Sequence, residues 1–282
     1  MAIADKLRPA IAKITGNAPF CPWRSALALL DPRLLRVYPP TLNIKEVGRE
    51  DGLVCFRFGN EHDFWFPEET NISPELWSEY LVVFWNHRKN FHNYVSEFYA
   101  LSSSDVVYDC GACEGFFTRF ALESGVRKVF SIEPSTQMAQ ALARTFKDEI
   151  QDDKVCIQHV ALSSISAKAH FSFDESNAFG GRLEKEGATE VEVTTIDILS
   201  QELVVPTFIK MDLEGCEYEA LRGGLQVLGQ YHPRIAATTY HFPHDYAVIY
   251  AFLRTLGYIH CRPQGVTDRG GKCFRPYLIK AA

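Results

Sequence analysis

The sequence lacks the long apolar runs of a membrane protein. None of its stretches approaches the roughly 18 apolar residues that span a bilayer, so no membrane span is expected. The opening residues Met-Ala-Ile-Ala-Asp-Lys-Leu-Arg also lack the apolar stretch and cleavage site of a signal peptide, and they predict an amphipathic helix instead. We therefore expect a cytoplasmic protein. The 282 residues are 46% hydrophobic and 23% charged, which allows one large domain with an extension.

Positive charge is also scarce. The chain has 29 lysines and arginines against 35 acidic residues, and its formal net charge is −6. A protein that binds nucleic acid neutralises phosphates with clustered lysine and arginine side chains. We therefore expect no nucleic acid among the partners of this protein.

A second pair of closely spaced cysteines is missing too. The eight cysteines are scattered, and Cys110-x-x-Cys113 has no second pair at metal-ligand spacing. The glycines beside this pair explain the segment better than a metal or redox site does. Buried thiols in a reducing cytoplasm are the simplest interpretation.

The first 95 residues differ in texture from the rest, since they hold all four tryptophans. Residues 53–58 alternate as a strand does, and residues 63–67 can pair with them across a turn at residues 59–60. We expect residues 1–95 to form an α+β extension that binds substrate, acts as a lid or mediates oligomerisation. A homo-oligomer is compatible with this expectation.

A helix is expected from Ser73 to Leu101. Ser73 suits its cap and Pro74 its first position. Glu75 and Glu79 place acidic charge in the first turns, as helix starts commonly do. The aromatic residues of this region form either the core of a helix and a hairpin or an apolar acceptor pocket.

From residue 105 the pattern becomes strand, turn and helix, repeated. The expected core strands cover residues 106–109, 128–133, 155–160, 207–212 and 234–240, and the expected helices cover residues 116–124, 137–148, 217–228 and 245–256. An extra hairpin is expected from residues 169–173 and 191–195, and an antiparallel edge pair from residues 258–261 and 273–279. This alternation predicts an α/β fold, with a doubly wound, mainly parallel seven-stranded sheet over residues 96–282.

Acidic residues and glycines follow the first two core strands. Asp109 ends the first strand, and Gly111 and Gly115 follow it. Glu133 ends the second strand, where an acid can accept hydrogen bonds from ribose hydroxyls. The spacing G-x-x-x-G lacks the third glycine that favours a pyrophosphate. The pattern therefore favours S-adenosylmethionine over a dinucleotide, and the alternatives are a dinucleotide-dependent oxidoreductase and a non-catalytic Rossmann module.

Two blocks of sequence resemble the FkbM-type branch of the class I S-adenosylmethionine-dependent methyltransferases. The first block is Val106 to Thr118 with Ser131-Ile-Glu-Pro-Ser135, and the second is Thr195-Ile-Asp-Ile-Leu199 with Ile209 to Gly224. The resemblance covers residues 95–262, and the family usually has Asn where this chain has Cys113. It implies a Rossmann-like fold and O-methylation of a hydroxyl, commonly on a sugar, a glycolipid or a polyketide-like metabolite.

The pattern and the resemblance together assign residues to the cofactor. The expected cofactor-binding residues are Asp109, Gly111, Ala112, Gly115, Phe116, Glu133, Pro134, Ala161 and Lys210. Ala161 lies in a segment that resembles the family's third strand end, where the backbone would face the adenine. Lys210 is expected to anchor a carboxylate, either that of Asp109 or that of the cofactor.

An aliphatic hydroxyl is a poor nucleophile at neutral pH, so methyl transfer to it needs positioning and benefits from a base. Asp212, after the fourth core strand, is the first candidate for acceptor binding or for the base, and Glu214 is the second. His241 ends the fifth strand and could itself be the base, or it could bind a divalent cation with Asp212. Glu217 belongs either to this set or to a helix N-terminus, where the dipole favours an acid.

A second enzyme class is methylation of nitrogen on a nucleic acid or a protein. Such enzymes carry an Asn/Asp-Pro-Pro-aromatic tetrad after the fourth strand, where this chain has Asp212-Leu-Glu-Gly215. The acidic net charge also disfavours a nucleic-acid substrate. We therefore expect a small-molecule or glycan acceptor.

Overall fold

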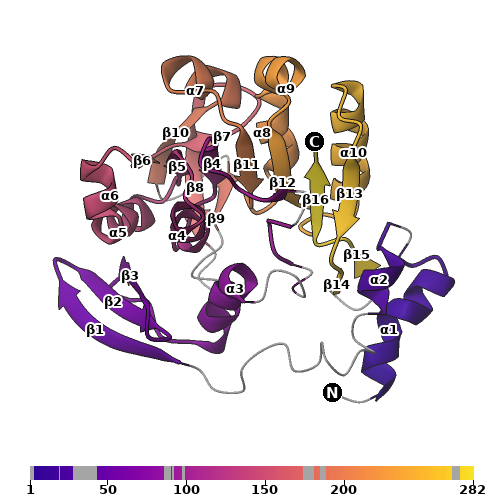
Figure 1. The fold of residues 1–282 in the computed structure, drawn as a ribbon, viewed down its shortest axis with the longest axis horizontal. Coiled ribbons are helices and arrows are strands. Elements are labelled where there is room, and N and C mark those ends of the chain that lie inside the picture. The colour runs from indigo at the N-terminus through magenta and orange to yellow at the C-terminus, as the bar shows by residue number, and fades with distance from the viewer. Residues whose placement is uncertain are drawn as a thin grey trace.

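In the computed structural model, a small N-terminal extension lies against a larger domain that is built on a seven-stranded sheet (Figure 1). The structure describes residues 3–18, 20–27, 43–85, 90, 92–96, 99–173, 181–184, 189–268 and 274–282. Within these residues, no helix combines the length and the apolarity that crossing a membrane requires.

The large sheet has the strand order β13-β16-β12-β11-β4-β5-β6. Its strands are β4 (Val106–Cys110), β5 (Lys128–Ile132), β6 (Val155–Gln158), β11 (Phe208–Met211), β12 (Arg234–Thr238), β13 (Cys261–Gln264) and β16 (Leu278–Ala281). The first five run parallel, while β16 is antiparallel to both β12 and β13. The predicted mainly parallel sheet and its antiparallel edge pair are therefore confirmed. The chain order reverses at β4, and in such sheets ligands bind outside the carboxyl ends of the strands at this point.

The edge pair begins later in the sequence than expected. The chain enters the sheet at Cys261 rather than at Tyr258. Tyr258 is buried, and its hydroxyl donates a hydrogen bond to the carbonyl oxygen of Pro233. It belongs to the hydrophobic core beside the sheet, which also holds Ile249 and Leu253, and not to the sheet edge.

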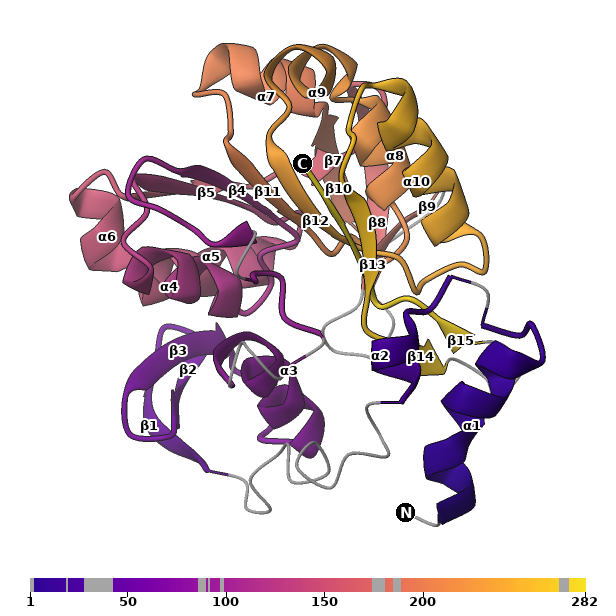
Figure 2. The same cartoon turned by 45° about the vertical axis from the view of Figure 1, so that its right-hand side comes forward.

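Helices cover both faces of the sheet, and each face has its own core (Figure 2). One face carries α4 (Phe116–Glu123), α5 (Thr136–Thr145) and α6 (Lys147–Gln151), and the other carries α7 (Ile196–Glu202), α8 (Glu217–Arg222), α9 (Leu225–Tyr231) and α10 (Asp245–Thr255). Neighbouring residues of a strand point to opposite faces, so Val107 joins the first core and Tyr108 the second.

One expected helix, over residues 217–228, is in fact two helices, α8 and α9. The chain bends at Gly223, where an added Cβ would lie 2.1 Å from the carbonyl oxygen of Ser163. The start of α9 is capped by Asp197, whose carboxylate accepts hydrogen bonds from the backbone N–H groups of Gln226 and Val227. Tertiary contacts at this bend therefore override the helical periodicity of the sequence.

The segment between the third and fourth core strands forms a second sheet. Its four strands are β7 (Ala161–Leu162), β10 (Thr189–Thr194), β8 (Ala167–Phe173) and β9 (Gly181–Glu184), in that order. The expected pairing of residues 169–173 with residues 191–195 is confirmed, since β8 and β10 are antiparallel with Ala169 opposite Val191. A separate two-stranded sheet joins β14 (Thr267–Asp268) to β15 (Phe274–Arg275).

The N-terminal extension contains α1 (Ile3–Ile14), α2 (Trp23–Ala26), the sheet β1 (Ile44–Glu50), β2 (Leu53–Phe58) and β3 (His62–Pro67), and α3 (Pro74–Phe84). The predicted hairpin of β2 and β3 is confirmed, and β1 adds a strand that the sequence pattern did not reveal. Aromatic rings of the hairpin and of α3 pack around Phe116 of the sheet domain, including Phe58, Phe64 and Tyr80. Of the two interpretations that the sequence allowed, the structure supports the first: the aromatic residues mainly form the core of a helix and a hairpin.

The expected long helix ends at Phe84 and does not reach Leu101. Its start is as predicted, because the backbone N–H of Leu76 donates to Ser73 Oγ. Its end is set by two buried asparagines farther along the chain. Asn90 Nδ2 donates to the carbonyl oxygen of Val82, and Asn93 Nδ2 donates to that of Val83. These amides cap the last turn, so the residues that carry them lie beside the end of the helix and do not continue it. Residues 86–89, 91 and 97–98 of the expected helix lie outside the described residues.

Candidate functional site

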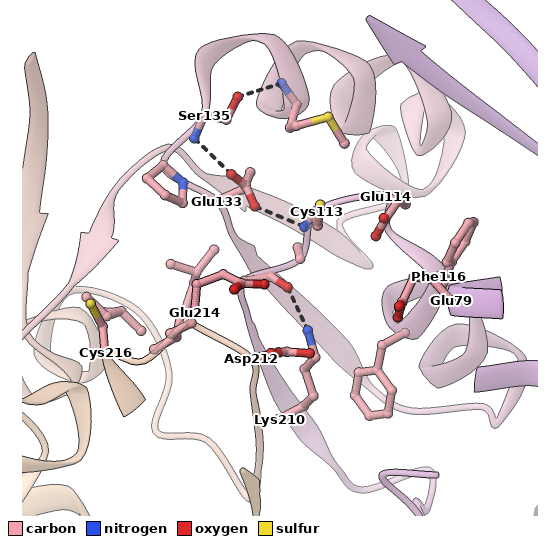
Figure 3. Close-up of a pocket in the computed structure, with 18 of the residues that line it drawn as sticks. Glu79, Cys113, Glu114, Phe116, Glu133, Ser135, Lys210, Asp212, Glu214 and Cys216 are labelled. Atoms are coloured by element: carbon pink, nitrogen blue, oxygen red, sulfur yellow. Dashed lines mark hydrogen bonds between the residues drawn. The ribbon is translucent and has the colours of Figure 1, made fainter. Parts of the chain in front are cut away.

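A cavity of about 280 Å³ lies at the carboxyl ends of β4, β5 and β11, between the sheet domain and α3 (Figure 3). The expected site residues that line it are Gly111, Ala112, Phe116, Glu133, Pro134, Ala161, Lys210, Asp212 and Glu214. Asp109, Gly115 and His241 lie behind its wall, since they are not among its lining residues. The roles of all twelve residues toward a ligand stay predictions.

The two glycines of the G-x-x-x-G segment serve close packing within the protein. Both have positive φ, 74° at Gly111 and 80° at Gly115, which favours glycine. A Cβ at Gly111 would lie 1.9 Å from the carbonyl oxygen of Asp212, and a Cβ at Gly115 would lie 2.6 Å from the ring of Phe146. Gly111 brings the ends of β4 and β11 together, and Gly115 lets α4 pack on α5.

Glu133 is fixed in place by the backbone. One carboxylate oxygen accepts a hydrogen bond from Cys113 N–H at 3.0 Å, and the other accepts one from Ser135 N–H at 2.9 Å (Figure 3). Ser135 Oγ in turn accepts from Met138 N–H and caps α5. Burial raises the pKa of Glu133, although these two N–H groups lower it in part. Each oxygen keeps acceptor capacity, which can serve hydroxyl groups in the cavity.

Asp109 and Lys210 form a buried ion pair beneath the cavity. Lys210 Nζ lies 3.0 Å from Asp109 Oδ1 and donates a hydrogen bond of 2.6 Å to the carbonyl oxygen of Gly111. Asp109 Oδ2 accepts a hydrogen bond from Thr118 Oγ1. Burial alone would lower the pKa of Lys210, but the carboxylates of Asp109 and Asp212 raise it above its usual range. Of the two carboxylates considered for Lys210, the structure pairs it with Asp109.

Cys113 occupies a left-handed backbone position, with a φ of 43°. Asparagine, which the resemblance to the family leads us to expect here, tolerates this conformation better than most residues with a side chain. The contact that this loop makes with Glu133 comes from the backbone N–H of Cys113, so the substitution preserves it. Burial raises the pKa of the Cys113 thiol well above its usual range, so the side chain stays neutral.

Asp212 is a cavity-lining carboxylate at the end of β11. Tyr94 Oη donates a hydrogen bond of 2.8 Å to Asp212 Oδ2, and Lys210 lies below it. Burial raises the pKa of Asp212, although Lys210 and His241 lower it in part. The sequence did not identify Tyr94 as a partner of Asp212, because the expected long helix included it.

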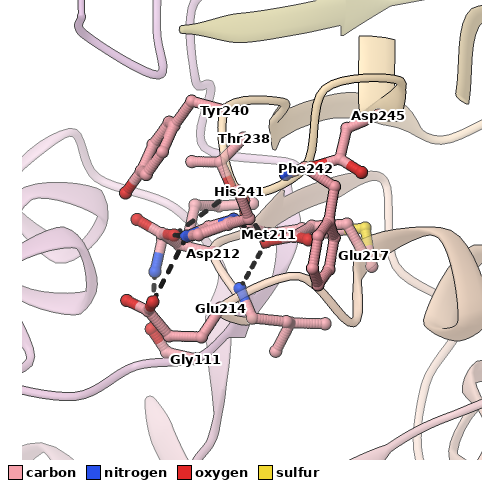
Figure 4. A network of polar contacts seen from close by, with 12 residues as sticks. Gly111, Met211, Asp212, Glu214, Glu217, Thr238, Tyr240, His241, Phe242 and Asp245 are labelled. Carbon is pink, nitrogen blue, oxygen red and sulfur yellow. Dashed lines mark hydrogen bonds and ion pairs between the residues drawn. The ribbon is translucent and has the colours of Figure 1, made fainter. Parts of the chain in front are cut away.

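His241 is fully buried among three carboxylates (Figure 4). Its Nδ1 lies 3.1 Å from Glu217 Oε1, and its Nε2 lies 3.4 Å from Glu214 Oε2 and 3.8 Å from Asp212 Oδ1. Burial alone would lower the pKa of His241, but Glu214 and Glu217 raise it to about 10. The ring is therefore an imidazolium at neutral pH, which argues against the expected role of His241 as a base.

Glu217 was expected either in the catalytic set or at the N-terminus of a helix. It is buried, and it accepts hydrogen bonds from Leu213 N–H and from Thr238 Oγ1, both at 2.8 Å. The histidine and the Leu213 N–H outweigh burial and hold the pKa of Glu217 below its usual range. Glu217 is thus both the first residue of α8 and the partner of His241.

A divalent cation has one candidate site in the described part of the chain. Ligand atoms of Asp212, Glu217 and His241 all lie within 4.8 Å of one another, so the predicted pair Asp212 and His241 gains a third member. The same geometry suits an imidazolium, because each ring nitrogen of His241 faces a carboxylate. A metal would need one of these nitrogens without its proton.

Further acidic residues of the cavity were not assigned to it from the sequence. Glu75 and Glu79 of α3 and Glu114 of the loop after β4 line the cavity. Glu79 and Glu114 lie across it from Glu133 (Figure 3). Glu79 is solvent-exposed, and partial desolvation at the cavity, followed by the neighbouring Glu114, raises its pKa. The spacing of four residues between Glu75 and Glu79 placed both on one helix face, but the sequence did not show what this face contacts.

Glu114 makes the free energy of unfolding depend on pH. Burial raises the pKa of Glu114 to about 7, from 4.5. The unfolded chain releases this proton at lower pH, so stability present below pH 4.5 is lost as the pH rises to about 7. The loss is on the order of 3 kcal/mol.

Glu114→Gln removes this titration. In denaturant unfolding of the ligand-free protein, we expect wild type and variant to be equally stable near pH 4.5, with the variant gaining relative stability up to about pH 7. A stability difference that does not change with pH would contradict this.

The similarity of this chain to known proteins identifies its family and supports its fold. The family model of the methyltransferase FkbM domain matches the sequence over residues 109–260, which is more than half of the chain. No curated protein matches the chain. The crystal structure of the methyltransferase FkbM from Methylobacillus flagellatus KT matches with 19% identity and a TM-score of 0.50, over 64% of this chain and 44% of that one.

This chain thus spans less than half the length of that solved structure. An rRNA methylase from Streptococcus thermophilus also matches, with 13% identity and a TM-score of 0.41, over 64% of this chain and 88% of that one. The likeness to the FkbM structure supports the Rossmann-like fold, and the match over residues 109–260 includes the ends of β4, β5 and β11. The chain therefore belongs to the FkbM family of S-adenosylmethionine-dependent methyltransferases.

Proposed function

We propose that the cavity binds S-adenosylmethionine and that the chain transfers its methyl group to a hydroxyl of a small molecule or a glycan. Glu133 would accept hydrogen bonds from the ribose hydroxyls, because backbone N–H groups hold both of its oxygens at the cavity wall. Pro134, Met138 and Ala161 supply an apolar wall beside it, which suits the adenine.

The remaining predicted cofactor residues act in two ways. Gly111, Ala112 and Phe116 line the cavity and would contact the cofactor directly. Asp109 and Gly115 lie behind the wall and would act by holding the loop after β4, as does Lys210 through its hydrogen bond to Gly111. The residues present therefore fit a nucleoside with an amino-acid tail.

Asp212 is the residue that supports a hydroxyl as the acceptor of the methyl group. When bound, S-adenosylmethionine supplies a methyl group that passes from its sulfonium to the attacking oxygen and leaves a neutral thioether. The hydroxyl proton goes to Asp212, whose raised pKa makes the carboxylate a better proton acceptor than an exposed aspartate. Tyr94 donates to the other side of Asp212 and keeps its own proton, because burial raises the pKa of the phenol far above neutral.

His241 and Glu217 would position this base and not exchange protons with the acceptor. Glu217 is held by Leu213 and Thr238, and it faces Nδ1 of His241. The imidazolium then presents Nε2 toward Glu214 and Asp212 at the cavity. Glu214 sits at a φ of 52° before Gly215, so the turn that aims its carboxylate is also fixed by the backbone.

The proposed base can be tested with Asp212→Asn. We expect kcat to fall by about 10²- to 10⁴-fold, since general-base catalysis contributes that much. Calorimetry should show an affinity for S-adenosylhomocysteine within about threefold of wild type, because an interaction made in the transition state lowers kcat without changing cofactor binding. Asp152→Asn, which changes an exposed carboxylate away from the cavity, is the matched control. Unchanged turnover of Asp212→Asn would rule out the base.

Adding a chelator tests whether a divalent cation binds at His241. Because both nitrogens of His241 face carboxylates, we propose that the charge between Asp212 and Glu217 is an imidazolium and not a divalent cation. Activity should then be the same with and without a chelator. Loss of activity with the chelator, restored by added magnesium or manganese, would instead assign Asp212, Glu217 and His241 as metal ligands.

The alternative acceptor, a nitrogen on a nucleic acid or protein, has a simple test. Activity on metabolite extracts stripped of macromolecules supports the small-molecule proposal and counts against the alternative. The acidic residues of the cavity favour the first outcome, since they would repel a phosphate backbone.

A further inference from the structure

Helix α1 of the N-terminal extension exposes large apolar side chains and buries small ones. Leu7, Ile11 and Ile14 share one stripe of the helix, at the spacing i, i+4 and i+7, and Ile14 is 74% exposed. Ala10 and Ala12 are buried instead. A helix that only completed a globular core would bury its large apolar residues. The exposed stripe is therefore a candidate interaction surface.

The fold holds α1 in this orientation. Ala12 packs with Ala18 and Cys21 in a small core that also receives the ring of Phe274. The backbone N–H of Phe274 donates a hydrogen bond of 3.1 Å to the carbonyl oxygen of Asn17, just after the helix. The helix thus lies at the edge of the molecule beside β14 and β15 (Figure 2), with its alanines on the protein and its stripe turned outward.

The exposed apolar surface continues beyond α1. Phe20, Trp23 and Leu27 are each between 45% and 50% exposed. The ring of Phe20 lies 5.1 Å from that of Tyr246 in α10, so contact with the sheet domain fixes this part as well. Tryptophan is common where an apolar phase meets water, because its ring is apolar and its N–H is polar. The N-terminal apolar surface consists of Leu7, Ile11, Ile14, Phe20, Trp23 and Leu27.

Positive charge accompanies this surface in a chain that is otherwise acidic. Residues 1–27 contain four lysines and arginines against one acidic residue, whereas the remaining 255 residues contain 25 against 34. Two of the four, Arg8 and Lys13, fall on opposite flanks of the stripe at helical spacing. An apolar helix face with basic residues beside it is typical of helices that lie in the interface of an anionic membrane.

A second copy of the chain suits the N-terminal apolar surface less well. Most homo-oligomers pair identical surfaces about a twofold axis. A dimer formed through this surface would bring two positively charged segments together, and like charges repel each other. The headgroups of an anionic lipid surface attract the same segment instead.

We propose that the N-terminal apolar surface binds the headgroup region of an anionic lipid bilayer. Its apolar side chains insert between the headgroups, while Arg8 and Lys13 contact the lipid phosphates. The helix then lies on the bilayer without crossing it, in agreement with the lack of a membrane-spanning helix in the described residues. This inference is independent of the proposed function, because the residues of the N-terminal apolar surface do not line the cavity.

Vesicle sedimentation with the full-length protein tests the inference. We expect the protein to sediment with vesicles of phosphatidylcholine and phosphatidylglycerol, and to bind vesicles of phosphatidylcholine alone at least about tenfold more weakly. Binding to the anionic vesicles should weaken as salt is added, because ions screen the headgroup charge. No sedimentation with either vesicle, or equal binding to both, would overturn the anionic lipid surface.

The apolar stripe is removed by combining Ile11→Glu with Ile14→Glu. Glutamate forms helices as well as isoleucine does, so α1 should be retained, which circular dichroism would check. We expect binding to the anionic vesicles to weaken by at least about tenfold, because two apolar contacts are lost and two negative charges are added.

The matched control combines Ile165→Glu with Ile259→Glu. These isoleucines are 66% and 69% exposed and lie outside the N-terminal apolar surface. This variant carries the same change of charge and should bind the anionic vesicles within about twofold of wild type, since screening limits charge effects to short distances. An equal loss of binding in both double variants, or in neither, would contradict the assignment to α1.

Light scattering without lipid distinguishes a second copy from a lipid surface. We expect wild type and the variant that combines Ile11→Glu with Ile14→Glu to have the same mass in solution. A wild-type dimer that this variant does not form would overturn the lipid surface and assign the stripe to a second copy of the chain.

Discussion

The buried ion pair of Lys210 and Asp109 is the interaction on which the site depends. It joins the ends of β4 and β11, and the same ammonium holds the carbonyl oxygen of Gly111. Gly111 in turn has no room for a side chain against Asp212. The loop that faces the proposed cofactor and the carboxylate that faces the proposed acceptor are therefore positioned by one lysine. Two charges of this kind are stable in the interior only because each is paired and hydrogen-bonded.

Sequence alone predicted the sheet and nine of the residues that line the cavity, because both follow from local pattern. Strands that end in acids and glycines predicted the ends of β4, β5 and β11, and parallel strands bring such ends together. The block that most resembles the family, from Thr195 to Gly224, has a largely structural explanation. Thr195 caps α7, Asp197 caps α9, and Gly223 packs against the backbone of Ser163. In this chain the block therefore fixes the fold around the site.

The contribution of the N-terminal extension could not be predicted, because it depends on contacts between distant residues. Tyr94 can donate to Asp212 because α3 ends at Phe84, where Asn90 and Asn93 bind its last carbonyl oxygens. Glu79 was visible in the sequence as part of a helix start, and only the packing of α3 over the cavity makes it a cavity-lining residue. The core shared by the hairpin, α3 and α4 makes this arrangement a fixed part of the molecule.

The proposed function depends most on Glu133, which would bind the ribose of S-adenosylmethionine at the end of β5. Titration calorimetry with S-adenosylhomocysteine, on wild type and on Glu133→Gln, tests it most directly. In the variant, one backbone N–H that now donates to Glu133 would face an amide NH₂, so binding should weaken by about 10- to 100-fold. Glu202→Gln, an exposed change away from the cavity, should bind as wild type does. Equal affinity of wild type and Glu133→Gln, or no binding by wild type at millimolar ligand, would contradict the account.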